Sequence, residues 1–265
     1  MTQKWKRGFR LKLKDNKGAN PSSYLKSVEL NMTKLDLDYL EAYKKKFIYS
    51  CPKCSGTNYL CDCRKGFNLE ILKISAKIPI KYRPFTLDQI THPQVQTSKN
   101  KIATYIESLK DNRNNGKCLY LNGSKGLAKT VFGNIILIEA LKQGLKAYYI
   151  ESLNVCIDDT ISGWKGHRDS VSMNDIISGY DFIVVDGIGE GVSNVANATE
   201  SLKRSFRNRY NNMLPVIFIS NIKKDDIVDL TENHIIRLFS ACTEDISFKG
   251  FNYEENVLSK VKKHD

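Results

Sequence analysis

The feature that most constrains the fold is an eight-residue segment, Gly123-Ser-Lys-Gly-Leu-Ala-Lys-Thr130, between an apolar run and a helical pattern. It matches the phosphate-binding pattern G-x-x-x-x-G-K-[ST] except at its sixth position. In such a loop, backbone N–H groups face a polyphosphate, the lysine reaches its β and γ oxygens, and the threonine hydroxyl binds Mg²⁺. The apolar run at 118–121 predicts a strand before the loop, and the apolar face of 129–142 predicts an amphipathic helix after it. The segment therefore predicts an ATP·Mg²⁺ site.

Ala128 is the departure from the pattern, because a glycine is expected at this position. A methyl group there strains a left-handed backbone or crowds the nucleotide. The alternative interpretation is an ordinary glycine-containing turn before a core helix. We favour nucleotide binding because the strand, the helix and the Lys-Thr pair all accompany the loop. The predicted nucleotide-binding residues are Gly123, Ser124, Lys125, Gly126, Leu127, Ala128, Lys129 and Thr130.

Short apolar runs alternate with helical patterns over residues 116–265. Continuous runs such as Phe182-Ile-Val-Val185 indicate strands that are covered on both faces, which favours a parallel sheet with crossover helices. The predicted fold is therefore a three-layer α/β domain. Its predicted strands are 118–121, 147–150, 182–185, 216–220 and 245–248, and its predicted helices are 129–142, 153–161, 198–210 and 233–241.

An acidic residue ends the third predicted strand, in Tyr180-Asp-Phe-Ile-Val-Val-Asp186. In a sheet whose first strand leads to a phosphate-binding loop, a carboxylate at this strand end holds the Mg²⁺ shell. Strands also end in Asp to make a turn, so Asp186 is a candidate mainly because the loop is present. Hydrolysis needs a second carboxylate to orient the attacking water, but Gly187 comes next. Glu190 is the candidate for that role, and simple solvent exposure is its alternative.

Two further polar residues are candidates for the γ-phosphate region. Asn221 follows the strand predicted at 216–220, where it can hydrogen-bond the attacking water or the γ-phosphate, or instead cap a helix over 223–228. Arg237 lies in a mostly apolar helix and can act as a charge clamp on the γ-phosphate of a neighbouring subunit. A surface salt bridge is an equally weighted alternative for Arg237.

Four of the seven cysteines are close together in the sequence, as Cys51, Cys54, Cys61 and Cys63. Their C-x₂-C-x₆-C-x-C spacing offers four thiolates for a tetrahedral Zn²⁺ site, with an Fe–S cluster as the alternative. An odd cysteine total without a signal peptide argues against a secreted disulfide framework. A segment this short has too little core to fold by itself, so metal binding is expected to supply folding free energy.

Composition divides the chain into three predicted parts. Residues 1–75 form a basic, zinc-binding domain, and residues 76–115 form a proline-containing linker with a leading helix over 97–110. Residues 116–265 form the ATP-binding domain.

The formal net charge of +12 suits a nucleic acid partner, although net charge alone often reports only solubility. Basic residues in 1–17 and 203–209 are the candidate DNA contacts, with a merely solvated terminus as the alternative for 1–17. No apolar run approaches the roughly 20 residues that a membrane helix requires, so we expect a soluble cytoplasmic protein without a membrane partner.

The order and spacing of these motifs resemble the DnaC/DnaI-type helicase loaders, which are AAA+ ATPases, in a divergent, phage-like form. The resemblance covers about residues 50–253. It rests on the cysteine cluster, Ile78-Pro-Ile-Lys-Tyr-Arg-Pro-Phe-Thr-Leu-Asp88, the phosphate loop, Val184-Val-Asp-Gly-Ile-Gly189, and the segments 209–221 and 246–250. It implies an AAA+-like three-layer parallel sheet preceded by a small zinc-binding N-terminal domain, with Asn221 as sensor 1 and Arg237 as the arginine finger.

Two departures from that family bear on turnover. Gly187 stands where the family usually has a second acidic residue, and Glu254 stands where an arginine is common. These departures favour slow ATP hydrolysis, or an ATP-binding switch with little turnover.

The predicted function is ATP-dependent loading of a replicative, DnaB-type hexameric helicase onto single-stranded DNA during DNA replication. The resemblance implies that residues 1–75 dock the helicase and that the chain forms a homo-oligomer when assembled on helicase or DNA. If phage-encoded, the protein would act in the host cytoplasm. One alternative is an IstB-like transposition helper ATPase, which shares the ATPase domain. The other is a non-hydrolysing, zinc-containing DNA-binding adapter, which Ala128 and Gly187 would suit.

Overall fold

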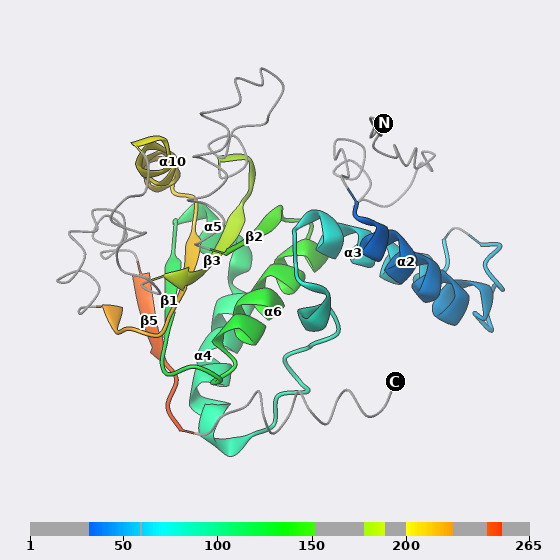
Figure 1. Ribbon diagram of the computed structural model, residues 1–265, viewed down its shortest axis with the longest axis horizontal. Coiled ribbons are helices and arrows are strands. Elements are labelled where there is room, and N and C mark those ends of the chain that lie inside the picture. The colour runs from blue at the N-terminus through cyan, green and yellow to red at the C-terminus, as the bar shows by residue number, and fades with distance from the viewer. Residues whose placement is uncertain (1–31, 59, 152–177, 189–199, 225–242, 251–265) are drawn as a thin grey trace, which may run out of the picture.

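The computed structural model describes residues 32–58, 60–151, 178–188, 200–224 and 243–250. Within these ranges, five strands form one parallel sheet in the order β2-β3-β4-β1-β5 (Figure 1). The strands are β1 (Cys118–Asn122), β2 (Ala147–Glu151), β3 (Phe182–Ile188), β4 (Val216–Ser220) and β5 (Thr243–Ser247). Each predicted strand is present, and its ends differ from the expected ones by three residues at most. The predicted α/β class and parallel sheet are confirmed.

Helices cover both faces of this sheet. On one face lies α10 (Glu200–Asn211), where the rings of Phe206 and Phe218 stack with centroids 6.4 Å apart. On the other face, α6 (Lys129–Lys142) packs against strand residues such as Leu119 (Figure 1). Because alternate strand residues point to opposite faces, this arrangement buries every position of β1 and β4. The expected three layers are confirmed.

Helix α6 is buried nearly all the way round, whereas the sequence predicted an amphipathic helix. Besides the sheet, α3 (Asp62–Ser75) and α4 (Gln96–Glu107) pack against it, and Phe132 and Ile136 are buried along with the predicted apolar face. The buried amide of Asn134 donates from Nδ2 to the carbonyl of Thr130 at 2.8 Å, whereas its buried Oδ1 has no hydrogen-bond partner among the described residues. The prediction was wrong because it assumed a solvent-facing side that other helices in fact cover.

The predicted leading helix is two helices, α4 and α5 (Leu109–Asn114), which meet at Ser108. The helical part of the chain therefore extends to Asn114, beyond the predicted end at 110. Buried Asn112 donates to the carbonyl of Tyr105 at 2.8 Å and joins the two helices across the break.

The N-terminal helices form a layer beyond α6 (Figure 1). Thr33 caps α2 (Lys34–Tyr43), and its hydroxyl and the carboxylate of Asp36 form a capping box. A π-helical segment, Lys44–Tyr49, follows α2, and α3 begins directly after Cys61 and contains Cys63. Buried residues of these elements share one continuous core with α6. The domain division at residue 75 stays a prediction.

Residues 76–95, the proline-containing part of the linker, contain two short 3-10 turns, Ile80–Tyr82 and Pro93–Val95, and no longer helix, as the prolines predict. Its first residue, Ala76, accepts a backbone hydrogen bond of 2.8 Å from Tyr149, so the linker runs along the outer edge of β2.

The helices predicted at 153–161 and 233–241 lie outside the described residues, as do the basic segment 1–17 and most of 223–228. None of the described helices combines the length and the apolar composition that crossing a bilayer requires.

Candidate nucleotide site and cysteine cluster

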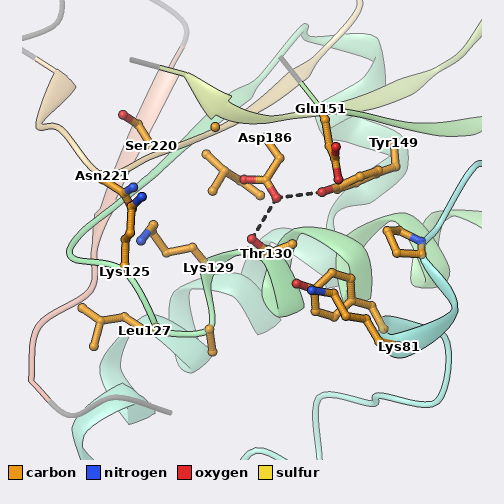
Figure 2. Close-up of a pocket in the computed structure, with 16 residues that line it drawn as sticks. Lys81, Lys125, Leu127, Lys129, Thr130, Tyr149, Glu151, Asp186, Ser220 and Asn221 are labelled. Atoms are coloured by element: carbon orange, nitrogen blue, oxygen red, sulfur yellow. Dashed lines mark hydrogen bonds between the residues drawn. The ribbon is translucent and has the colours of Figure 1, made fainter. Parts of the chain in front are cut away.

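A cavity of about 400 Å³ opens at the carboxyl ends of β2, β3 and β4, beside the loop that follows β1 (Figure 2). The strand ends contribute Glu151, Asp186 and Asn221 to its wall, and the loop contributes residues 125–130. The linker segment 79–82 supplies part of the remaining wall. Carboxyl ends of parallel strands are the usual ligand-binding edge of an open α/β sheet, so the predicted loop lies where a ligand is expected.

The loop conformation follows from two of its residues. Gly123 has a φ of +142°, and a side chain there would collide with the backbone oxygen of Phe248, so only glycine fits. Ala128 has a φ of +64° and lies in the left-handed region directly before α6. The backbone strain predicted for Ala128 is therefore present, because its Cβ lies too close to the backbone in this conformation, whereas glycine has no Cβ.

The Lys129 side chain folds back over the loop. Its Nζ donates to the carbonyl oxygens of Gly123 at 2.6 Å and of Ser124 at 2.7 Å, and only 6% of the residue is exposed. These two carbonyl oxygens carry no net charge and do not neutralise the ammonium group, so Lys129 can attract an anion. The position of Lys129 fits the predicted contact with phosphate.

Thr130 and Asp186, far apart in the sequence, meet in the cavity. The Thr130 hydroxyl and the Tyr149 hydroxyl both donate to Oδ2 of Asp186, each at 2.8 Å (Figure 2). A hydroxyl and a carboxylate at this separation are hard oxygen ligands of the kind that Mg²⁺ binds beside a phosphate. These two residues therefore fit the magnesium site predicted from the sequence.

Burial raises the pKa of Asp186, and the hydrogen bonds from Thr130 and Tyr149 only partly offset this effect. Burial, together with the nearby charge of Asp186, also raises the pKa of Tyr149. Both shifts arise first from burial, which disfavours the charged form of each group. A cation bound there would stabilise the charged form of Asp186.

The residues after Asp186 explain how the neighbouring strand ends are joined. Gly187 has a φ of +82°, and the register between β3 and β4 shifts at this point. The Ser220 hydroxyl donates to the carbonyl of Ile188 at 2.6 Å and accepts from the backbone N–H of Ile222 at 3.0 Å. Ser220 thus fixes the turn that places Asn221 on the cavity wall.

The structure brings together most, but not all, of the predicted residues. Lys125, Lys129, Thr130, Asp186 and Asn221 line one cavity, whereas Glu190 and Arg237 lie outside the described residues. Lys81, Tyr149 and Glu151 are among the wall residues that were not predicted from the sequence. The rule that parallel strands end at one edge could have found Tyr149 and Glu151, because they end the second predicted strand.

The four clustered cysteines converge on one point. Their sulfur atoms all lie within 4.8 Å of one another, with Cys51 and Cys61 Sγ atoms 3.8 Å apart and Cys54 and Cys63 Sγ atoms 3.5 Å apart. Around a tetrahedral zinc with Zn–S bonds of about 2.3 Å, neighbouring sulfurs are separated by about 3.8 Å. The sulfur positions therefore fit a Cys₄ zinc site.

Backbone groups and a helix end support this cluster. The backbone N–H of Ser55 donates to the carbonyl of Cys51 at 2.8 Å, which closes the turn between the first two cysteines. Cys61 precedes the first residue of α3, where helix N–H groups favour a thiolate. Arg64 donates from Nη2 to the carbonyl of Gly56 at 2.6 Å and ties α3 to the cysteine loop.

The thiols of the cluster differ in acidity. Although burial opposes the change, backbone hydrogen bonds from Asn58 and Gly56 lower the pKa of Cys54 to about 6. Burial and hydrogen bonds with the thiols of Cys54 and Cys61 raise the pKa of Cys63 to about 12. Four adjacent thiolates repel one another, and a bound cation is the group that would allow all four to ionise.

Helix α10 was predicted as a DNA contact through its basic residues. Phe206 faces the sheet as expected, and Arg207 is exposed, but Arg209 is completely buried. Its guanidinium donates to the carbonyls of Tyr180, Asp181 and Pro215 at 2.8, 3.0 and 2.7 Å. Burial lowers the pKa of Arg209 to about 9. Arg209 holds the starts of β3 and β4 and is therefore not available to contact DNA.

The parallel sheet, its strand order and the loop beside Asp186 define an AAA+-like α/β fold. No protein-family profile matches the sequence, and no curated protein is similar to it in sequence. Solved structures do match, and they include the DnaC helicase loader, with a TM-score of 0.52 and 17% identity over 64% of this chain and 100% of DnaC.

Two more solved structures support the same fold. DnaI matches with a TM-score of 0.52 and 18% identity over 66% of this chain and 94% of DnaI. The replication initiator DnaA, bound to AMPPCP and single-stranded DNA, matches with a TM-score of 0.54 and 16% identity. The match covers 70% of this chain and 56% of DnaA. The resemblance to DnaC and DnaI expected from motif order is confirmed as a likeness of fold.

Proposed function

We propose that this protein is an ATP-dependent loader of a replicative, DnaB-type hexameric helicase onto single-stranded DNA. The observation that carries this proposal is the meeting of Thr130 and Asp186 at one cavity with the Lys129 loop. The fold likeness to DnaC and DnaI adds support for the loader class. Such a role places the protein in the cytoplasm, in the host if the chain is phage-encoded.

Each cavity residue has a proposed role. Lys129 and the N–H groups of residues 123–130 bind the phosphates, while Thr130 and Asp186 hold Mg²⁺ and its water shell. Asn221 senses the γ-phosphate, as a polar side chain at the end of β4 on the cavity wall. Glu190 stays a candidate for water activation, and Arg237 a candidate arginine finger across a subunit boundary.

The nucleotide site is tested by Lys129→Ala, with binding of a fluorescent ATP analogue measured in Mg²⁺. We expect at least a hundredfold weaker binding, because the substitution removes the only proposed point charge on the β and γ oxygens. Lys142→Ala is the matched control, since Lys142 lies at the exposed end of the same helix and pairs with Glu139. Equal affinities of the wild type and Lys129→Ala would refute the site.

The proposed zinc-binding part presents apolar side chains to solvent. The large hydrophobic residues exposed there are Leu35, Leu37, Phe47, Tyr49 and Leu60. Large apolar side chains that are exposed on a folded protein often contribute to protein-binding surfaces. We therefore propose that residues 1–75, folded around Zn²⁺, dock the helicase, and that the ATP-binding part contacts single-stranded DNA. The proposed assembly is a homo-oligomer formed on helicase or DNA.

Partner capture separates the loader from its alternatives. We expect the full chain to co-purify with a DnaB-type helicase in the presence of ATP and to stimulate its loading on single-stranded DNA. Phe47→Ser should weaken capture without changing nucleotide affinity, because Phe47 is exposed and distant in sequence from the cavity residues. Stimulation of a transposase instead would favour the IstB-like helper, and DNA binding without ATP turnover would favour the adapter.

A further inference from the structure

The acidic side chains of the cavity are distributed over two strands. Among the described residues that line it, Asp186 and Glu151 are the two acids. Asp186 is followed by Gly187, at the position where the resembled family usually has a second acidic residue, and its φ of +82° disfavours any other side chain there. A second carboxylate is nevertheless present at the cavity, on the neighbouring strand.

The register of the sheet places Glu151 beside Asp186. Glu151 ends β2 and pairs directly with Asp186 of β3. Paired residues of adjacent parallel strands project to the same face, with backbones about 4.8 Å apart. Figure 2 shows the Glu151 side chain next to Tyr149, on the same side of the sheet as Asp186. Glu151 is exposed, so water reaches its carboxylate.

The hydrogen bonds of Asp186 indicate that the two carboxylates at the cavity have different roles. Its Oδ2 accepts from both Thr130 and Tyr149, and this oxygen is therefore already committed to fixed donors. Such a carboxylate is suited to holding a metal shell and poorly suited to taking a proton from a mobile water. The more accessible carboxylate at the cavity is the better proton acceptor.

We propose that Glu151 is the carboxylate that orients and deprotonates the attacking water, in place of the acid missing at Gly187. The water oxygen forms a bond to the γ-phosphorus, and the bond from that phosphorus to the β,γ-bridging oxygen breaks. The bridging oxygen keeps the electron pair and leaves as part of ADP. The water proton passes to the Glu151 carboxylate and from there to solvent. This assignment rests on the proposed function, because it requires ATP in the cavity.

The test compares Glu151→Gln with the wild type, measuring kcat, the affinity for ATP at several Mg²⁺ concentrations, and the nucleotide retained after gel filtration. Glutamine keeps the shape but cannot accept the proton, so we expect kcat to fall about a hundredfold or more. Affinity should stay within about threefold, and the variant should retain ATP where the wild type retains ADP. Glu151→Asp, which keeps the charge on a shorter stem, should have an intermediate kcat.

Glu107→Gln is the matched control, because Glu107 is exposed at the end of α4 and does not line the cavity. Its kcat should equal that of the wild type, and far-ultraviolet circular dichroism should confirm that all variants fold. A Glu151→Gln enzyme with unchanged kcat overturns the assignment, as does a wild type that binds ATP without turning it over. A tenfold or greater change in Mg²⁺ dependence also overturns it, since Glu151 would then be a metal ligand. Failure of the wild type to bind ATP defeats the proposed function itself.

Discussion

The nucleotide cavity and the cysteine cluster are built by opposite means. The cavity lies at the edge of a sheet whose central strands are fully buried, so its residues are placed by packing. The cysteines lie on a turn and at a helix start, where only Cys51 is buried. Buried packing fixes positions without a ligand, whereas a loop with little core depends on what it binds.

The polar contacts at the two sites show the same difference. In the cavity, Lys129, Thr130 and Tyr149 all donate to protein oxygens within the site. In the cluster, the thiols of Cys51 and Cys61, and of Cys54 and Cys63, contact one another. The side chains of the cavity are thus already held in position before a ligand binds, whereas the cluster requires a cation to hold its thiolates together. Four predictions test this contrast.

Metal removal should have the largest effect. Structural zinc binding contributes about 10–16 kcal/mol to folding in small zinc modules. We expect chelation, or Cys54→Ser, to abolish amide protection over 44–75 in hydrogen exchange. Protection of β1 and β4 should persist, because neither strand contains one of the four clustered cysteines and every position of both strands is buried.

Cys118→Ser is the control for the cysteine substitution, since Cys118 is buried in β1 and outside the cluster. It should leave the bound metal unchanged. Equal loss of protection in the sheet and in 44–75 after chelation would show that the two regions unfold as one, contrary to the contrast drawn here.

Arg209→Met should have the next largest effect, now in the sheet. The substitution leaves the carbonyls of Tyr180, Asp181 and Pro215 without their shared donor, which we expect to cost about 3–5 kcal/mol of the free energy of unfolding. Urea unfolding followed by circular dichroism measures this loss. Arg207→Met is the control, because Arg207 is exposed on the same helix.

The metal content of Arg209→Met should equal that of the wild type, since Arg209 donates at the starts of β3 and β4 and not near the cysteines. A drop in bound zinc in this variant would mean that the two regions are not independent.

The sequence predicted the parts of this molecule that depend on local chemistry. The five strands followed from continuous apolar runs, and the cysteine cluster followed from its spacing alone. The loop was predicted because its residues are contiguous, including the strained backbone now seen at Ala128. These features need no knowledge of which segments later come together.

The missed features all depend on tertiary contacts. The burial of α6 on every side comes from α3 and α4, which the helical pattern does not reveal. Tyr149 and Glu151 reach the cavity through strand register, and Lys81 through the path of the linker along β2. The burial of Arg209 was not predicted, because an arginine in a run of basic residues is usually exposed on the surface.

Arg83 joins the linker, which lines part of the cavity, to α2 in the N-terminal part of the chain. This contact allows a third test. Its Nε donates to the carbonyl of Ile78 at 2.9 Å, and its Nη2 bonds Asp36 at 2.9 Å with both side chains mostly buried. We expect Arg83→Gln to cost about 1–3 kcal/mol, because a buried charge-assisted bond is lost. Hydrogen exchange should increase over 78–83, where the linker approaches the cavity.

The control for Arg83→Gln is Arg207→Gln, an exposed arginine of α10. Unchanged exchange over 78–83 in Arg83→Gln would show that this hydrogen-bonded contact does not hold the linker.

Ala128→Gly should have the smallest effect and the opposite sign. Removing the Cβ relieves the left-handed strain and stabilises the folded variant by about 1 kcal/mol. Glycine also raises the conformational entropy of the unfolded chain, which offsets part of this stabilisation. We therefore expect an increase of about 0.5 kcal/mol in the free energy of unfolding, measured by urea unfolding. Ala103→Gly, in the interior of α4, is the matched control and should instead lose about 0.5–1 kcal/mol. If both variants were destabilised equally, the backbone at 128 would not be strained, and packing alone would not explain the loop's conformation.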